Sequence, residues 1–196
     1  KIIMKINTNK IIQNHFFQHL EVIKKTYSNL FFQINKAADL MALSIKKKGT
    51  IFWCGNGGSA SDSMHLSAEL IGRFKKNRKP LKSISLSSNA STLTCISNDF
   101  GYENIFSRQF DALAKKEDIL VAISTSGNSK NIVNVLNIAK KKRVKTISFL
   151  GNKGGKCKNK ANLSLTIPST STARIQEMHI FIGHILCDLI ERKLNL

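Results

Sequence analysis

Hydroxyl side chains gather around a single glycine in the segment Ile123–Ser129. The segment follows the apolar run Ile119–Ala122, which predicts a buried strand, and it precedes apolar residues at helical spacing. The first turn of a helix offers free N–H groups and the positive end of the helix dipole, and hydroxyls donate further hydrogen bonds to an anion. The sequence therefore predicts a loop that binds the phosphate of a small molecule. Its hydroxyl-bearing residues are Ser124, Thr125, Ser126 and Ser129.

A second loop, Cys54–Asp62, also follows an apolar run and is rich in glycine. Gly57 and Gly58 give the backbone freedom and allow a ligand to approach closely. Ser59 and Asp62 have the spacing of an N-terminal helix cap. An ordinary turn between a strand and a helix has the same composition. The presence of the hydroxyl-rich loop at an equivalent strand end favours ligand binding.

His65 and Glu69 lie on the helix predicted after this second loop. A separation of four residues places them on one face of a helix, with Cβ atoms about 5–6 Å apart. The pair suits two ligands of one metal ion, or a base beside the residue that orients it; an exposed pair on a solvated face is the alternative. Because the helix begins at the second loop, we expect both side chains to point back toward the ligand.

The closing helix carries Gln176 and His184, about 80° apart around a helix. The two side chains can therefore face one site, although a histidine beside an apolar stripe is also an ordinary core residue.

The segment Asn98–Tyr102 is a turn by composition. The amide of Asn98 and the carboxylate of Asp99 are able to bind sugar hydroxyls, but a purely structural turn has the same composition.

Apolar runs alternate with segments at helical spacing from residue 50 onward. This alternation predicts an α/β fold, a doubly wound and mostly parallel sheet with helices on both faces, in three layers. Ligands of such sheets bind outside the carboxyl ends of the strands, where both loops fall. The predicted strands are Thr50–Cys54, Leu81–Leu86, Ile119–Ser124, Val144–Leu150 and Leu163–Ile167. The predicted helices of this part are one that ends near Phe74, Ser91–Ile96, Ile105–Ala114, Lys130–Lys142 and Thr172–Leu194.

The segment Ile11–Lys48 repeats apolar side chains at steps of three or four, which predicts one long helix. Gly49 is expected to end it. A helix of this length before the first strand is expected to pack on another subunit as well as on its own core. We therefore expect a single domain, with a helical arm at residues 1–48 and an α/β core at residues 49–196.

The formal net charge of +19 comes from 25 Lys against only 6 Arg. Arginine is the better reader of bases and phosphates, so this balance favours a solvated surface over nucleic-acid binding, with steering of anionic substrates as a compatible benefit. No segment reaches the roughly 20 apolar residues of a membrane span, and residues 1–10 lack the apolar core of a secretory signal. The widely spaced cysteines predict free thiols and a cytoplasmic location.

Five motifs follow one another along nearly the whole chain. They are Cys54–Asp62 with His65, Glu69–Phe74, Asn98–Asp99, Ile123–Ser129 and Thr172–His179. In this combination they closely resemble the sedoheptulose 7-phosphate isomerases, the phosphoheptose isomerase family. The resemblance implies a flavodoxin-like sugar isomerase (SIS) fold with a long first helix.

The resemblance also implies an activity, the isomerisation of sedoheptulose 7-phosphate to D-glycero-D-manno-heptose 7-phosphate, the first step toward the ADP-heptose of the lipopolysaccharide core. A proton moves between C1 and C2 through an enediol. The family's general base corresponds to Glu69 and its partner acid/base to His184. The substrate phosphate corresponds to Ser124, Thr125, Ser126 and Ser129. The sugar-lining residues correspond to Asn56, Gly57, Gly58, Glu69, Asn98, Asp99 and Gln176.

The resemblance further implies one zinc ion per subunit, and a homotetramer with active sites at subunit interfaces. The zinc ligands correspond to His65, Glu69, Gln176 and His184, in which glutamine is a poor ligand. This chain departs from the family at Asn162, near which an aspartate is usual, and in the lysine-rich loop Lys153–Lys160. We expect neither departure to touch the chemistry.

A non-catalytic scaffold of the same fold, which associates with the replication initiator, shares both loops and the segment Ala173–Glu177. That scaffold lacks the carboxylate and the imidazole that this chain has at Glu69 and His184, so the enzyme is favoured. A sugar-phosphate-sensing regulator would need a DNA-binding domain, for which we expect no room in 196 residues.

Overall fold

The computed structural model describes residues 7–196; residues 1–6, the start of the predicted arm, lie outside the described residues. Five parallel strands form one sheet in the order β2-β1-β3-β4-β5. This order is the flavodoxin-like one, and it reverses direction between β1 and β3, where open α/β sheets bind ligands. The strands are β1 (Ile51–Gly55), β2 (Ser83–Ser85), β3 (Ile119–Ser124), β4 (Lys145–Gly151) and β5 (Leu163–Ile167).

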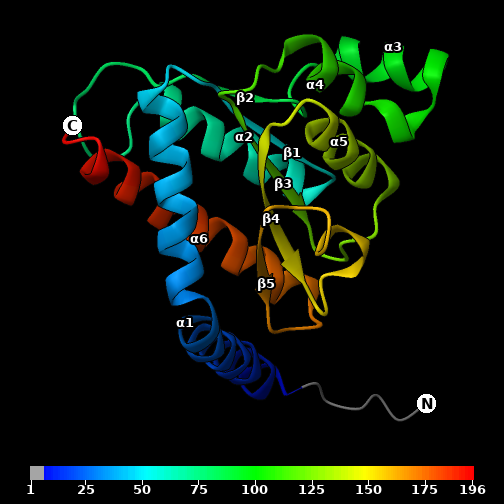
Figure 1. Cartoon of the computed structure of the whole chain (residues 1–196). Helices are drawn as coiled ribbons and strands as arrows, with labels where there is room; N and C mark the ends of the chain where they lie inside the picture. Colours follow the sequence, from blue (N-terminus) through cyan, green and yellow to red (C-terminus); the bar gives the residue numbers. More distant parts are fainter. Residues whose placement is uncertain (1–6) are drawn as a thin grey trace.

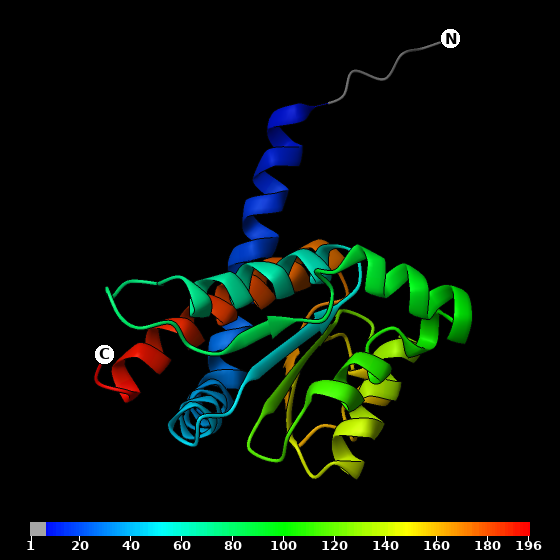
Figure 2. The ribbon, with the colours of Figure 1, turned by 90° about the horizontal axis from the view of Figure 1, so that it is seen from above.

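Helices cover both faces of the sheet, as the alternating pattern predicts. α1, α2 and α6 pack on one face and α4 and α5 on the other, which gives three layers (Figures 1 and 2). None of the helices formed by residues 7–196 is long and apolar enough to cross a membrane. The α-helices are α1 (Thr8–Lys46), α2 (Gly58–Ile71), α3 (Ala90–Phe100), α4 (Ser107–Leu113), α5 (Lys130–Lys141) and α6 (Thr172–Lys193). Two short 3₁₀ turns are η1 (Tyr102–Asn104) and η2 (Gly155–Cys157).

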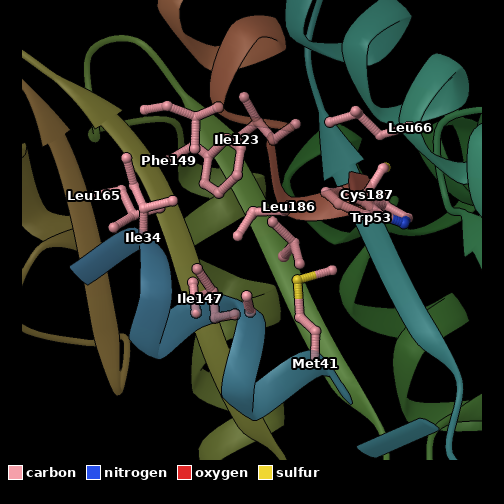
Figure 3. Close-up of a cluster of buried hydrophobic side chains, with 14 of the residues drawn as sticks. Ile34, Met41, Trp53, Leu66, Ile123, Ile147, Phe149, Leu165, Leu186 and Cys187 are labelled. Atoms are coloured by element: carbon pink, nitrogen blue, oxygen red, sulfur yellow. The ribbon is translucent and has the colours of Figure 1, made fainter. Parts of the chain in front are cut away.

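Alternate residues of β1 and β3 enter two separate cores. In β1, Trp53 packs under α1 and α6 with Met41 and Leu186 (Figure 3), whereas Phe52 enters the core under α4 and α5. Burial of each large apolar side chain contributes about 1.5–3 kcal/mol. The indole N–H of Trp53 donates to Ser83 Oγ at 2.9 Å, so its one polar group is satisfied. The sheet is therefore a rigid base for the loops and helices that extend from it.

Helix α1 ends at Lys46, close to the predicted end at Lys48. The residue that takes the left-handed conformation after the helix is Lys48, with φ 62°, and not the glycine that follows it. A Cβ at Gly49 would collide with the carbonyl oxygen of Glu117. Gly49 therefore lets the chain pass close to the loop before β3.

The N-terminal half of α1 projects away from the α/β body (Figure 2) and carries large exposed apolar side chains. Phe32, further along the helix, is 81% exposed. An apolar surface of this extent is typical of an interface with another protein chain. The exposed apolar residues of α1 include Ile11, Ile12, Phe16, Phe17, Leu20, Tyr27, Phe31 and Phe32.

The prediction of a turn at Asn98–Tyr102 is wrong for its first residues. Asn98 and Asp99 belong to the last turn of α3, which runs four residues beyond the predicted helix end and stops only where Gly101 adopts φ 84°. The polar composition of this segment is that of a helix end on the surface, and composition alone does not separate the two.

Candidate active site

The hydroxyl-rich loop joins β3 to α5, as expected. The hydroxyl of Ser124 accepts a hydrogen bond from Gly127 N at 3.1 Å, and that of Ser126 accepts one from Asn128 N at 3.2 Å. Ser129 is the N-cap residue of α5, but its side chain caps no backbone N–H. Ile132 N, in the first turn of α5, donates to Asn131 Oδ1 at 2.9 Å, and the Ser129 hydroxyl lies 3.5 Å from that of Ser124. The N–H groups of Lys130 and Asn131 remain at the helix N-terminus, where an anion is favourable. The loop therefore has the strand-to-helix position that the sequence predicts, and the binding of a phosphate there stays a prediction.

The lysine-rich loop Lys153–Lys160 packs against the hydroxyl-rich loop. Gly127, at φ 65°, packs directly on the backbone of Gly154, where no Cβ would fit. Cys157 N donates to the Gly127 carbonyl at 2.9 Å, and Lys156 N donates to Asn128 Oδ1 at 3.1 Å. The contact joins distant segments, so no local sequence signal revealed it.

The other departure from the family pattern is Asn162. Its side-chain oxygen accepts from Thr146 N at 2.9 Å and connects the starts of β4 and β5, away from the loop.

The glycine loop precedes α2 but is capped differently from the prediction. The N-cap is Gly57, at φ 55°, with no side-chain cap, and α2 begins at Gly58. Ser59 therefore lies inside the helix, and the predicted cap by Ser59 and Asp62 is wrong. Because Gly57 has no Cβ, it reaches this left-handed conformation at little cost and leaves the helix N-terminus open.

The two loops are joined by a pair of amide side chains. Asn56 Nδ2 donates to Asn131 Oδ1 at 3.0 Å, and Asn131 Nδ2 donates back to Asn56 Oδ1 at 2.9 Å. The hydroxyl of Tyr102 also donates to Asn56 Oδ1 at 2.9 Å. Sequence reasoning missed Asn131 and Tyr102, because their importance comes only from this long-range contact. The ends of β1 and β3 therefore form one polar surface at the reversal point of the sheet.

His65, Glu69 and His184 form a second group, which we call the His–Glu–His cluster. The Nε2 atoms of His65 and His184 are 3.4 Å apart, and His65 Nε2 is 3.2 Å from Glu69 Oε1. All three donor atoms lie within 4.8 Å of one another. Tetrahedral zinc with bonds of about 2.0–2.1 Å separates its ligands by about 3.4 Å. The donor set and its spacing therefore fit a zinc ion.

Two neighbours shape this cluster. The ring of Phe74 stacks on His184, with centroids 5.6 Å apart and an interplanar angle of 19°. Asp62 lies one helical turn before His65; burial raises its pKa to about 6, and the charge of His65 opposes that rise. Phe74 appeared in the sequence only as part of a motif, and nothing local indicated that it would contact a histidine.

Within one chain, the cluster and the phosphate loop are separated, which differs from expectation. His65 and Glu69 follow Gly58 by about 10 Å and 16 Å along the axis of α2, at 1.5 Å per residue. The two residues therefore lie along α2, well beyond the glycine loop of their own chain, and His65 is exposed.

Gln176 lies with the glycine loop and not with the cluster. A Cβ at Gly58 would come within 2.6 Å of Gln176 Nε2, so the amide rests on the start of α2. Gln176 and His184 are about 12 Å apart along α6. The predicted four-residue ligand set is therefore divided, with three members together and Gln176 at the loop.

Asn98 and Asp99 are exposed at the end of α3. The Asn98 amide donates to Asp99 at 2.8 Å, and no hydrogen bond within residues 7–196 joins either side chain to the two loops. Only Tyr102, shortly after them, links this segment to Asn56.

Comparison with known proteins identifies close relatives. The SIS domain model matches residues 15–151. A phosphoheptose isomerase of Helicobacter pylori (strain P12) is 50% identical over 182 residues, covering 93% of this chain and 95% of the relative. A phosphoheptose isomerase from Nitratiruptor sp. is 46% identical over 180 residues, covering 92% of this chain and 96% of the relative. A solved phosphoheptose isomerase from Neisseria gonorrhoeae superposes with a TM-score of 0.90 at 35% identity, and one from Francisella tularensis with 0.92 at 33%; each covers 95% of this chain and 100% of the solved one.

Proposed function

Because this chain belongs to the phosphoheptose isomerases, a family of SIS-domain enzymes, we propose that it converts sedoheptulose 7-phosphate into D-glycero-D-manno-heptose 7-phosphate. It is an enzyme, a phosphosugar isomerase. The reaction moves a carbonyl group from C2 to C1 and begins the route to the heptose of the lipopolysaccharide core. The observation that carries the proposal is the approach of Glu69 and His184, a carboxylate and an imidazole, in one cluster.

Glu69 is the general base of the proposed reaction. It removes a proton from C1, which leaves an enediol across C1 and C2, and returns a proton to C2. A carboxylate in a pocket suits this step, because its surroundings can tune its pKa. Within residues 7–196 only Oε1 of the Glu69 carboxylate has a hydrogen-bond partner, His65, so Oε2 can act on the substrate.

His184 transfers the second proton, from the hydroxyl oxygen on C1 to the oxygen on C2. A histidine suits this step because it exchanges protons near neutral pH. Its ring stacks on Phe74 and makes an edge contact with the ring of His65, whose centroid lies 5.0 Å away.

We propose one zinc ion per subunit, held by His65, Glu69 and His184, with His184 binding through Nε2, its nitrogen in the cluster, and transferring the proton through Nδ1. Zinc, when bound, polarises a carbonyl and stabilises negative charge on its oxygen. Three protein ligands with an open fourth position are typical of catalytic zinc. Gln176, implied by the resemblance as a fourth ligand, rests on Gly58, and we propose that it contacts the sugar instead.

The substrate phosphate binds the hydroxyl-rich loop in this proposal, with the helix dipole of α5 behind it. The sugar contacts come from the glycine loop and from the end of α3, which Tyr102 connects to Asn56. The phosphate ligands are Ser124, Thr125, Ser126 and Ser129. The sugar contacts are Asn56, Gly57, Gly58, Asn98, Asp99 and Gln176.

A homotetramer with shared active sites explains the separation between the cluster and the phosphate loop. The phosphate and C1 lie at opposite ends of the substrate, and we propose that the loop of one subunit faces the cluster of another. The exposed apolar surface of α1 supports this assembly, because burying it between subunits removes large side chains from water.

We also propose a cytoplasmic location, on the ground that all four cysteines are free thiols, three of them buried. The alternative function, a non-catalytic scaffold, is not needed to account for any feature of residues 7–196. A binding scaffold needs no base and acid in one cluster, whereas this chain has both.

Incubation with sedoheptulose 7-phosphate in D₂O tests the proposal. The expected product is an aldoheptose 7-phosphate with deuterium at C2, because the base exchanges its proton with solvent before returning it. His184→Ala protein, which lacks the second acid/base, is the matched control and should form product far more slowly. Absence of any aldoheptose phosphate from zinc-loaded wild-type protein would contradict the proposed function.

A further inference from the structure

A buried ion pair joins the ends of the two helices that carry the His–Glu–His cluster. Arg78 belongs to the segment after α2, and Glu191 to the last turns of α6. Arg78 Nε donates to Glu191 Oε1 at 2.9 Å, and the two side chains are only 2% and 1% exposed. A pair this deeply buried persists only when the rest of its polar atoms are also satisfied.

The carboxylate of Glu191 binds three consecutive backbone N–H groups. Its Oε1 accepts from Phe74 N at 3.2 Å, and its Oε2 accepts from Lys75 N and Lys76 N, both at 3.1 Å. Burial raises the pKa of Glu191, but the backbone N–H groups and Arg78 outweigh it and hold the pKa below its usual value. The ionised carboxylate therefore fixes the path of the chain as it leaves α2.

The guanidinium of Arg78 binds the end of α2 itself. Nη2 donates to the carbonyl oxygen of Glu69 at 2.9 Å, and Nη1 donates to that of Leu70 at 2.8 Å. These carbonyls belong to the last turn, which has no intrahelical partners, and a cation is favourable at a helix C-terminus. Arg78 thus holds the backbone of the residue proposed as the base.

Phe74 extends the same network to the other catalytic helix. Its N–H is held by Glu191, and its ring stacks on His184, with centroids 5.6 Å apart. Glu191 and His184 are two turns apart on the same side of α6. One carboxylate therefore fixes both the backbone of Phe74 and, through its ring, one face of the imidazole.

We propose that Arg78 and Glu191 are positioning residues for the isomerase site. They hold Glu69 through its own carbonyl group and His184 through the Phe74 ring, and they touch neither substrate nor zinc. The inference rests on the proposed function of Glu69 and His184. It assigns a role in this reaction to a pair that lies outside every motif used to recognise the site.

The first test compares Glu191→Gln and Arg78→Lys with the control Arg192→Gln. Arg192 neighbours Glu191 but is 67% exposed and pairs with Asp188. Loss of a positioning contact of this kind typically costs about 10–100-fold in activity. We expect that fall in kcat for Glu191→Gln and Arg78→Lys, with an unchanged KM because the phosphate loop lies on other elements. Lysine keeps the positive charge of Arg78 but lacks the planar guanidinium that binds several acceptors at once. Arg78→Lys should therefore not retain the wild-type kcat.

Two further readouts do not depend on turnover. Zinc affinity should fall about 10–100-fold in both variants and stay at the wild-type value in Arg192→Gln. The NMR signals of the His184 ring, shifted by the Phe74 ring current, should move toward their position in Phe74→Leu. If Glu191→Gln fails to fold, Arg78→Lys and Phe74→Leu are measured in its place.

Folded variants with wild-type kcat, zinc affinity and His184 signals would overturn the inference. If the wild-type protein does not isomerise the sugar phosphate, the proposed function fails, while the zinc and NMR comparisons still decide whether this pair positions the cluster.

Discussion

The Nε2 atoms of His65 and His184 lie 3.4 Å apart although 119 positions separate the residues in the chain. Helices α2 and α6 make this contact possible by packing closely side by side. A Cβ at Gly183 would collide with the side chain of Leu66, so a larger residue immediately before His184 would force that side chain to move. The close approach of the two helices brings the imidazoles together beside Glu69.

Glu69→Gln should lower kcat by about 10²–10⁴-fold, the usual contribution of a general acid or base. Glutamine keeps the shape of the side chain but accepts no proton, so the oligomer and the substrate KM should change little. Steady-state kinetics and light scattering on the same preparation measure both. Normal turnover by Glu69→Gln would show that another group is the base.

Zinc should stabilise the wild-type protein against heat and should not stabilise His65→Ala. A ligand at 100 times its Kd adds about 2.7 kcal/mol to the free energy of unfolding, and the variant loses one of three ligands. Thermal unfolding with and without zinc after chelation measures the effect. Cys95→Ser, which removes an exposed thiol outside the cluster, is the control and should respond as the wild type does. Equal stabilisation of His65→Ala would place the zinc elsewhere.

Ser124→Ala should raise KM more than it lowers kcat. Its hydroxyl lies in the phosphate loop, distant from C1 and C2, and a hydrogen bond to a charged group contributes about 1.5–3 kcal/mol. We expect KM to rise roughly 10-fold or more, measured by steady-state kinetics. Thr166→Val, on strand β5 and separated from β3 by β4, serves as a control outside the loop. An unchanged KM would argue against this loop as the phosphate site.

His179 should make the protein less stable in acid. It is fully buried, and burial lowers its pKa to about 4, against the hydrogen bond to Leu150 O, which favours the charged form. Between pH 6.5 and 4, His179 binds a proton in the unfolded chain but stays neutral in the folded protein. The contribution of His179 to the free energy of unfolding is therefore complete above pH 6.5. It falls as the pH drops, by up to about 1.4 kcal/mol per pH unit.

Urea unfolding of the wild type, His179→Gln and the exposed control His15→Gln between pH 4 and 7 measures this effect. The slope of stability against pH should decrease in His179→Gln alone. An identical slope in all three proteins would assign the acid sensitivity to other groups.

Phe32→Glu should reduce the assembly to smaller species. Phe32 is 81% exposed in the single chain, and burying such a ring between subunits contributes about 1.5–3 kcal/mol, which a charge would reverse. Light scattering gives the mass. Leu113→Glu, an exposed apolar position on α4 away from α1, is the control and should keep the wild-type mass. An unchanged mass for Phe32→Glu would exclude this part of α1 from the interface.

The sequence by itself determined the α/β fold, the bounds of β3 and β5, the hydroxyl-rich loop after β3, and the placement of His65 and Glu69 on one helix face. These features depend on local periodicity, on residues next to one another, or on the order of motifs, all of which a sequence displays directly. Ser124 and Ser129 could be assigned to one site because the same short loop holds both.

Only the tertiary structure decided which distant residues meet. It placed Gln176 on Gly58, away from the two histidines, and laid Phe74 over His184. The family resemblance implies that His65 and His184 share a site, and the structure shows their contact. It also buried Arg78 against Glu191. The physical reason is that such contacts depend on strand order and on how α2 and α6 pack. Those quantities come from the packing of the whole core, and no local pattern of side chains records them.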